Sequence, residues 1–247
     1  MGLTVHYKLT ALADLTEAEA KQLVESLRRL AMRFYCEGWV DKVFPITSDS
    51  KTLRKFAPHW LSLPVPGREN VSTGVEVSPE AGFLFGVSVG ADCEPLWLGL
   101  CRYPEKVWYD GRDVRSMAGR GWRYAGFSKT QFASLHGWEH FMRCHCAVVH
   151  LLAACRSPEL RVKISDEGDY WPRRSLKALR QNLDQMNGIV AAAAGALKDC
   201  SPEATGENAV QSPIFAHRQF ERLEAEGAGQ FEVQLKKLRT LIGKRQP

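Results

Sequence analysis

The sequence lacks long hydrophobic runs and the common glycine-rich nucleotide-binding loops. Its longest apolar stretch, IVAAAAGAL at residues 189–197, is far shorter than the roughly 18 residues that a membrane span requires. Neither GxGxxG nor GxxxxGK[ST] occurs, which argues against the usual dinucleotide and P-loop sites. We therefore expect no membrane span and no bound cofactor.

Strong net charge and paired cysteines are lacking as well. The 33 Lys and Arg residues against 28 Asp and Glu leave a formal net charge of +5, which permits an anionic partner without requiring one. Seven cysteines is an odd number, and they are scattered along the chain. This usage favours reduced thiols in a cytoplasmic protein. The first residues lack a basic region followed by an apolar run, so we expect no secretory signal.

The first half of the sequence contains clear patterns of secondary structure. LTVHYKL (3–9) alternates as a β-strand does, and Thr16 with Glu19 predicts a capping box for a helix that ends at Gly38. Residues 39–80 are expected to be irregular. GFLFGVSV and PLWLGLCRY, separated by GADCE, form the best candidate for a β-hairpin.

The second half alternates between predicted strands and predicted helices. Residues 109–121 are typical of a loop, and WRYAGFSKTQFAS (122–134) of a strand. A histidine-rich helix follows, then the strand LRVKIS (160–165) and a helix over about 174–198. AAAAGA near the end of that helix has side chains small enough for another backbone to approach closely. The last segment is typical of one or two amphipathic helices interrupted at GAG.

The interleaved strands and helices, together with the antiparallel hairpin, favour an α+β fold. We expect a mixed or mainly antiparallel sheet with long helices packed on it, plus a C-terminal helical extension. The predicted division is an α+β domain over 1–200, a polar linker over 201–213 and a helical segment over 214–247.

The histidine-rich segment HGWEHFMRCHCAVVH (136–150) raises the question of a metal site. His136, Glu139 and His140 match the HxxEH pattern of the inverzincin metalloproteases, in which the histidines bind zinc and the glutamate activates water. At about 100° per residue, however, these side chains and Arg143 lie opposite the apolar face of the helix. Arg143 would repel a cation, so we expect a solvated polar face and no bound metal.

The same helical phase places His145 in the middle of the apolar face. A buried imidazole requires a hydrogen-bond partner. That partner is either a backbone carbonyl or a carboxylate, Asp166 or Glu167, from the DEGDYW stretch after the 160–165 strand. In the second case His145 and the acid form an acid–base pair in a polar pocket. The other side chains predicted to face that pocket are Tyr170, Trp171, Lys129 and Gln131.

Residues 102–129 combine positive charge with aromatic rings. Seven Lys and Arg residues stand against three acidic residues, interleaved with five Tyr and Trp residues. Such a mixture suits single-stranded nucleic acid, because cations neutralise phosphates and rings stack on bases. The candidate contact residues are Arg112, Arg115, Arg120 and Arg123. The alternative is an ordinary solvated loop.

Three functions follow from these patterns. The favoured one is a binding module that takes a small molecule or a protein partner in a polar pocket around His145 and the DEGDYW loop. The second is a hydrolase, dependent on metal through HxxEH or independent of metal through His145 and an acid. The third is a binder of single-stranded nucleic acid that uses the 102–129 segment.

Overall fold

A six-stranded antiparallel sheet forms the centre of the protein. The computed structural model describes residues 3–64, 72–109, 111–115, 121–200 and 210–243. The strand order is β10-β1-β9-β6-β5-β2. The strands are β1 (Thr4–Ala11), β2 (Lys42–Val43), β5 (Ala81–Ser88), β6 (Leu96–Arg102), β9 (Arg123–Lys129) and β10 (Leu160–Asp166). Every pairing is antiparallel, which confirms the expected α+β class.

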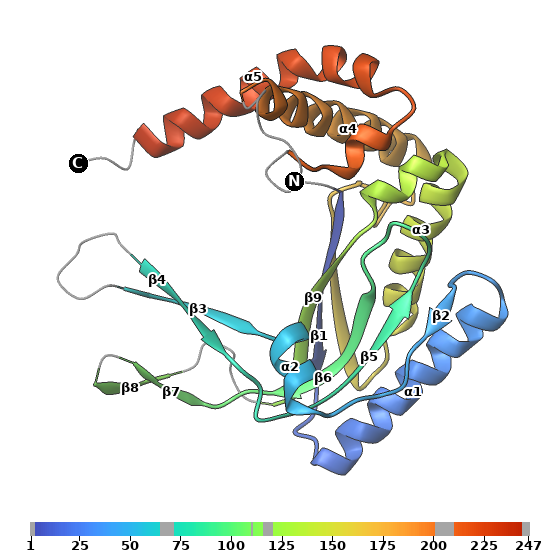
Figure 1. The fold of residues 1–247 in the computed structure, drawn as a ribbon. Coiled ribbons are helices and arrows are strands. Elements are labelled where there is room, and N and C mark those ends of the chain that lie inside the picture. The colour runs from blue at the N-terminus through green and yellow to red at the C-terminus, as the bar shows by residue number, and fades with distance from the viewer. Residues whose placement is uncertain (1–2, 65–71, 110, 116–120, 201–209, 244–247) are drawn as a thin grey trace.

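Two long helices cover one face of this sheet. Helices α1 (Glu17–Cys36) and α3 (Trp138–Ala154) lie on one side, and two β-hairpins project from the other (Figure 1). The alternation in β1 follows this asymmetry, because successive side chains point to opposite faces. Tyr7 and Leu9 are buried beneath the helices, whereas His6 and Lys8 are exposed on the opposite face. We call this second side of β10, β1 and β9 the open face.

The elements with a full periodic pattern occur where the sequence predicted them. Thr16 and Glu19 form the capping box of α1, and Gly38 follows the helix with a φ of 77°. The hairpin of β5 and β6 pairs over its whole length. In β10, Leu160 and Val162 are buried on one face.

The prediction that residues 39–80 are irregular was wrong. The region holds β2, the helix α2 (Ser50–Phe56) and a hairpin of β3 (His59–Pro64) with β4 (Ser72–Val77). Asp49 caps α2 by accepting a hydrogen bond from the Thr52 backbone N–H at 2.9 Å. These elements were missed because a seven-residue helix and six-residue strands are too short to establish a period.

The loop predicted over 109–121 is partly a hairpin. Strands β7 (Lys106–Tyr109) and β8 (Arg112–Arg115) pair across Gly111, whose φ of 73° suits a tight turn. Residues 110 and 116–120 lie outside the described residues. The strand predicted over 122–134 also ends early, because β9 stops at Lys129 and a 3₁₀-helix, η1 (Gln131–His136), follows it.

The C-terminal helices pack on each other at one end of the sheet (Figure 1). They are α4 (Leu176–Asp199) and α5 (Phe220–Gly243), with the short η3 (Pro213–Ala216) before α5. Helix α5 runs through GAG without the expected interruption. A Cβ atom on Gly227 would lie 1.9 Å from the carbonyl oxygen of Gly188, so this glycine permits close helix packing. No helix in the described part of the chain has the length and apolar character of a membrane span.

Candidate functional site

His145 is buried in α3 and bonded to two side chains. It has 0% of its surface exposed, as the helical phase predicted. Its Nδ1 lies 2.8 Å from Thr130 Oγ1, and its Nε2 lies 3.0 Å from Asp166 Oδ1. The backbone N–H groups of Gly168 and Trp171 donate to the two oxygens of the same carboxylate, at 2.7 and 2.9 Å. Asp166 is therefore held by three donors from two different elements.

These contacts keep the carboxylate ionised in the core. Burial by itself raises the pKa of Asp166, but hydrogen bonding and charge from His145, with the two backbone donors, lower the pKa below its ordinary value. Neither side chain of the pair has exposed surface. A Cβ atom on Gly168 would lie 3.0 Å from His145 Nε2, so the backbone of this loop closes over the imidazole. A ligand reaches the pair only if the loop moves.

Of the other acidic and aromatic residues predicted around His145, Tyr170 lies beside the imidazole, and Glu167 and Trp171 have different partners. Glu167 accepts a hydrogen bond from the backbone at the start of β1, at 2.9 Å. The Tyr170 ring lies edge-on to His145, with centroids 6.5 Å apart, and its hydroxyl lies 2.8 Å from His150 Nε2. Trp171 is half-buried, and the guanidinium of Arg156 lies over its ring. Only Asp166 of the two candidate acids contacts His145.

Lys129 and Gln131 also have partners away from His145. Lys129 Nζ lies 3.8 Å from Glu94 Oε1. Gln131 is fully buried, and its amide accepts from a backbone N–H of the N-terminal segment and donates to Asn187 Oδ1 at 2.9 Å. Its contacts therefore join the N-terminal segment and α4. A ligand site around these residues remains a prediction.

The HxxEH residues face the loop between β5 and β6. His136 Nε2 lies 2.6 Å from Asp92 Oδ2, and His140 Nε2 lies 3.2 Å from the carbonyl oxygen of Ala91. Glu139 is exposed. Among the residues that the structure describes, no three His, Cys, Asp or Glu side chains are arranged to hold a metal ion. The two histidines act here as loop contacts.

The predicted nucleic-acid residues are dispersed. Arg123 begins β9 on the open face, where its Nε is buried without a hydrogen-bond partner in the described part of the chain. Arg112 and Arg115 begin and end β8 in the projecting β7–β8 hairpin. Arg120 lies outside the described residues. Of the four arginines, Arg123 alone is placed on the central sheet.

Arg123 belongs to a group of cations on the open face that the sequence patterns did not identify. Lys8 lies directly opposite Lys163 of β10, and Thr10 lies between Arg161 of β10 and Arg123 of β9. We call Lys8, Arg123, Arg161 and Lys163 the cation row. Lys8, Arg161 and Lys163 are exposed, and none of the four has an ion pair or side-chain hydrogen bond among the described residues.

This arrangement lowers stability in the free protein. Like charges directly opposite each other on a sheet repel, and the row has no internal anion to offset the repulsion. The positive potential is evident at His59 of β3, whose pKa is lowered by burial and then by the charges of Lys8 and Arg123. An anion that binds across the strands would relieve the repulsion. The open face therefore has the electrostatic character of an anion-binding surface.

Large aromatic side chains lie exposed beside the cation row. Phe127 lies opposite His6 on the open face, with 55% of its surface exposed. Trp60 on β3, which lines the same cleft as Phe127, is 61% exposed. Single exposed apolar residues are common, but two large exposed rings beside unpaired cations are typical of interaction surfaces. The available signal in the sequence was the presence of basic residues at the outward-facing positions of β1, β9 and β10.

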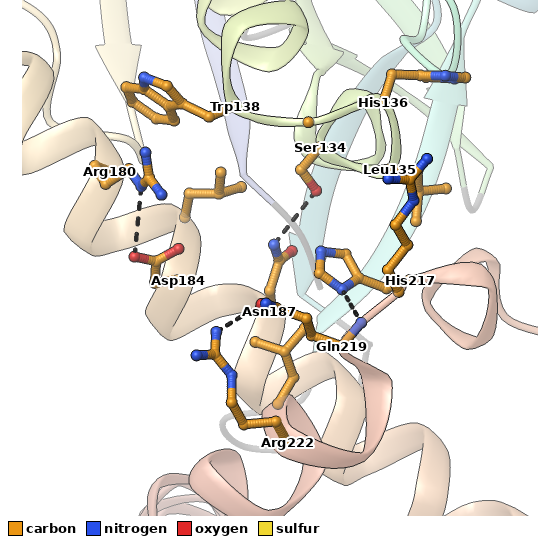
Figure 2. A pocket seen from close by; sticks show the side chains of 14 residues that line it. Ser134, Leu135, His136, Trp138, Arg180, Asp184, Asn187, His217, Gln219 and Arg222 are labelled. Carbon is orange, nitrogen blue, oxygen red and sulfur yellow. Dashed lines mark hydrogen bonds and ion pairs between the residues drawn. The ribbon is translucent and has the colours of Figure 1, made fainter.

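A second polar site lies between η1, α4 and α5. The cavity has a volume of about 500 Å³. Figure 2 shows Asn187 donating to Ser134 and Arg180 pointing toward Asp184. Arg222 donates to a nearby amide oxygen and pairs with a glutamate one turn later. Because these arginines already have partners, the cavity offers an anion less uncompensated charge than the cation row does. The residues that line it are Ser134, Leu135, His136, Gly137, Trp138, Arg180, Leu183, Asp184, Asn187, His217, Arg218, Gln219, Arg222 and Leu223.

Comparison of the chain with known protein families, with curated proteins and with solved structures gave no significant match.

Proposed function

We propose that this protein binds single-stranded nucleic acid through the phosphates, on the open face of its sheet. The main evidence for this proposal is the cation row. Its four side chains extend over three neighbouring strands, and none has an anionic partner among the described residues. Phosphate contacts from Lys and Arg provide most of the sequence-independent affinity for nucleic acid.

The aromatic residues favour a single strand over a duplex. Unpaired bases stack on exposed rings, whereas the bases of a duplex already stack on one another. Phe127 lies on the same face as the cation row, so a strand crossing the face meets phosphate-binding and ring surfaces together. The β3–β4 hairpin projects from this side of the sheet (Figure 1), and its exposed Trp60 lines a cleft together with Phe127.

The charge of the row can be tested by removing its two lysines. We expect the double variant Lys8→Ala and Lys163→Ala to bind a fluorescent 12-nucleotide strand on the order of tenfold more weakly near physiological salt, because two phosphate-binding cations are removed. Both lysines are exposed, so folding should be preserved. The measurement is fluorescence anisotropy over a protein titration.

The matched control removes the same charge elsewhere. Lys21 on α1 and Lys42 on β2 are exposed; α1 packs against β5 and β6, and β2 is the edge strand at the opposite end of the sheet from β10. Their double alanine variant should bind within about twofold of the unmodified protein, because only non-specific long-range attraction is reduced. Equal losses of affinity in both double variants, or no binding by the unmodified protein at low salt, would contradict the proposal.

A further inference from the structure

A cleft of about 520 Å³ opens between β6 and β9, beside the cation row. This volume lies within the range of small-molecule sites. The lining is mainly aromatic and apolar, with one cation and one carboxylate. The residues are Lys55, Phe56, Pro58, Trp60, Glu94, Pro95, Trp97, Tyr124, Ala125, Gly126 and Phe127.

The cleft exists because β6 and β9 separate soon after they meet. The two strands pair only at Cys101 and Arg123 in the described register, and the Glu94 N–H donates to the Lys129 carbonyl at the other end, at 2.9 Å. Between these two points, side chains instead of backbone hydrogen bonds fill the space between β6 and β9. The separation therefore leaves a depression within a sheet that is otherwise continuous.

Two tyrosine hydroxyls hold the separation open. Tyr7 donates to the Trp97 carbonyl, and Tyr124 donates to the Phe56 carbonyl at 2.9 Å. A Cβ atom on Gly126 would lie 2.7 Å from the Tyr7 hydroxyl, so the absence of a side chain at this position of β9 leaves room for that hydroxyl. The wall is thus fixed by buried polar contacts, and the cleft is formed before any ligand arrives.

Flat rings form the sides of the cleft. Phe56 and Trp97 stack with centroids 4.0 Å apart and an interplanar angle of 20°. Trp60 lies against Gly74 of β4, where a Cβ atom would be 3.3 Å from the indole. Phe127 lines the cleft from β9. Rings supported in this way present flat surfaces at little entropic cost.

The position of the cleft links it to the cation row. Ala125 lines the cleft and is the register partner of Lys8 on β1, and neighbouring strands lie about 4.8 Å apart. A strand whose phosphate contacts Lys8 therefore has the cleft within reach of its adjoining base. Glu94 also lines the cleft, and its carboxylate, which lies 3.8 Å from Lys129 Nζ, can accept hydrogen bonds from exocyclic amino groups.

We propose that this cleft holds one unpaired base of the bound strand, stacked on its aromatic walls. The inference rests on the proposed function, because the phosphates of the strand position the base. The cleft adds contacts to the base itself, which the cation row cannot provide. It predicts that affinity depends on the presence of bases and not only on charge.

The test compares a fluorescent 12-nucleotide strand with an abasic strand of the same length and charge. We expect the strand with bases to bind about tenfold more tightly, since stacking on a ring contributes about that much per base. Trp60→Ala and Phe127→Ala should each reduce this preference. Both residues are exposed, so the variants should fold, which circular dichroism checks. Trp108→Ala, an exposed tryptophan that does not line the cleft, should retain the preference.

The outcomes separate this inference from the proposed function. Equal affinity for both strands, with weakened binding of both by Lys8→Ala and Lys163→Ala, would overturn the base site and leave phosphate binding in place. No binding of either strand would overturn both proposals. A preference that survives Trp60→Ala and Phe127→Ala would place base recognition elsewhere and reject the cleft. Equal binding to anionic lipid vesicles would show that the surface recognises charge alone.

Discussion

The buried pair of His145 and Asp166 makes a quantitative prediction about stability. Replacing His145 with alanine removes two side-chain hydrogen bonds and leaves the Asp166 carboxylate in the core with only its backbone donors. Breaking a buried pair by deleting one partner costs about 3–5 kcal/mol. For a chain of this length, that cost lowers Tm by about 6–20 °C.

His136→Ala is the matched control on the neighbouring segment. His136 also contacts a carboxylate, Asp92, but this pair lies at the surface. An exposed pair contributes about 0–1 kcal/mol. Urea unfolding followed by circular dichroism gives both free energies of unfolding. Decreases that agree within about 0.5 kcal/mol would refute the assignment of His145 to the inward face.

The direction of the pH dependence follows from the lowered pKa of Asp166. Because the folded state holds this carboxyl group below its unfolded pKa of about 3.9, the pair stabilises the fold fully above that pH. The contribution is lost as the pH falls through the folded pKa. The difference between His145→Ala and the unmodified protein should therefore be largest near neutral pH and shrink on acidification. A constant difference would contradict this account.

Two further predictions concern helix packing and thiol reactivity. Gly227→Ala should lower stability by about 1–3 kcal/mol, because its Cβ would meet the backbone of α4 at 1.9 Å. Gly229→Ala in the same helix meets nothing within 4 Å and should raise stability by up to about 1 kcal/mol; equal thermal shifts would contradict the packing. Cys36 and Cys200 are exposed and should react rapidly with Ellman's reagent. Cys101 is buried, and burial raises its pKa to about 12, so rapid reaction there in the native protein would contradict its placement.

The long elements of the fold were predictable because each has a complete local pattern. Helix α1 has a capping box and a periodic stripe, and β10 alternates over its whole length. Helix α2 and the β3–β4 hairpin were not predictable, because their stability comes from a short cap and from pairing between short strands. The effect of GAG was misjudged for a related reason. Gly227 has to be glycine because the backbone of Gly188 on α4 lies against it. A pattern within residues 220–243 alone cannot predict this contact with another helix.

The candidate site was only partly predictable. Helical phase alone placed His145 inward, and the position of Asp166 after a strand made it one of two candidate partners. The cation row was missed because it depends on strand order. Lys8 and Lys163 lie opposite each other only because β1 is between β9 and β10 in the sheet. Basic residues at such positions are common in a sequence. What is unusual is that strand pairing places two of them directly opposite each other.

The salt dependence of oligonucleotide binding tests the central claim most directly. The logarithm of the binding constant falls linearly with the logarithm of the salt concentration, with a slope of about −0.7 per phosphate contact on a single strand. Four contacts therefore give a slope of about −3. Lys8→Ala with Lys163→Ala should bring that slope to about −1.5, while the Lys21 and Lys42 control keeps it unchanged. A slope near zero, or one that the removal of Lys8 and Lys163 does not alter, would contradict phosphate binding at the open face.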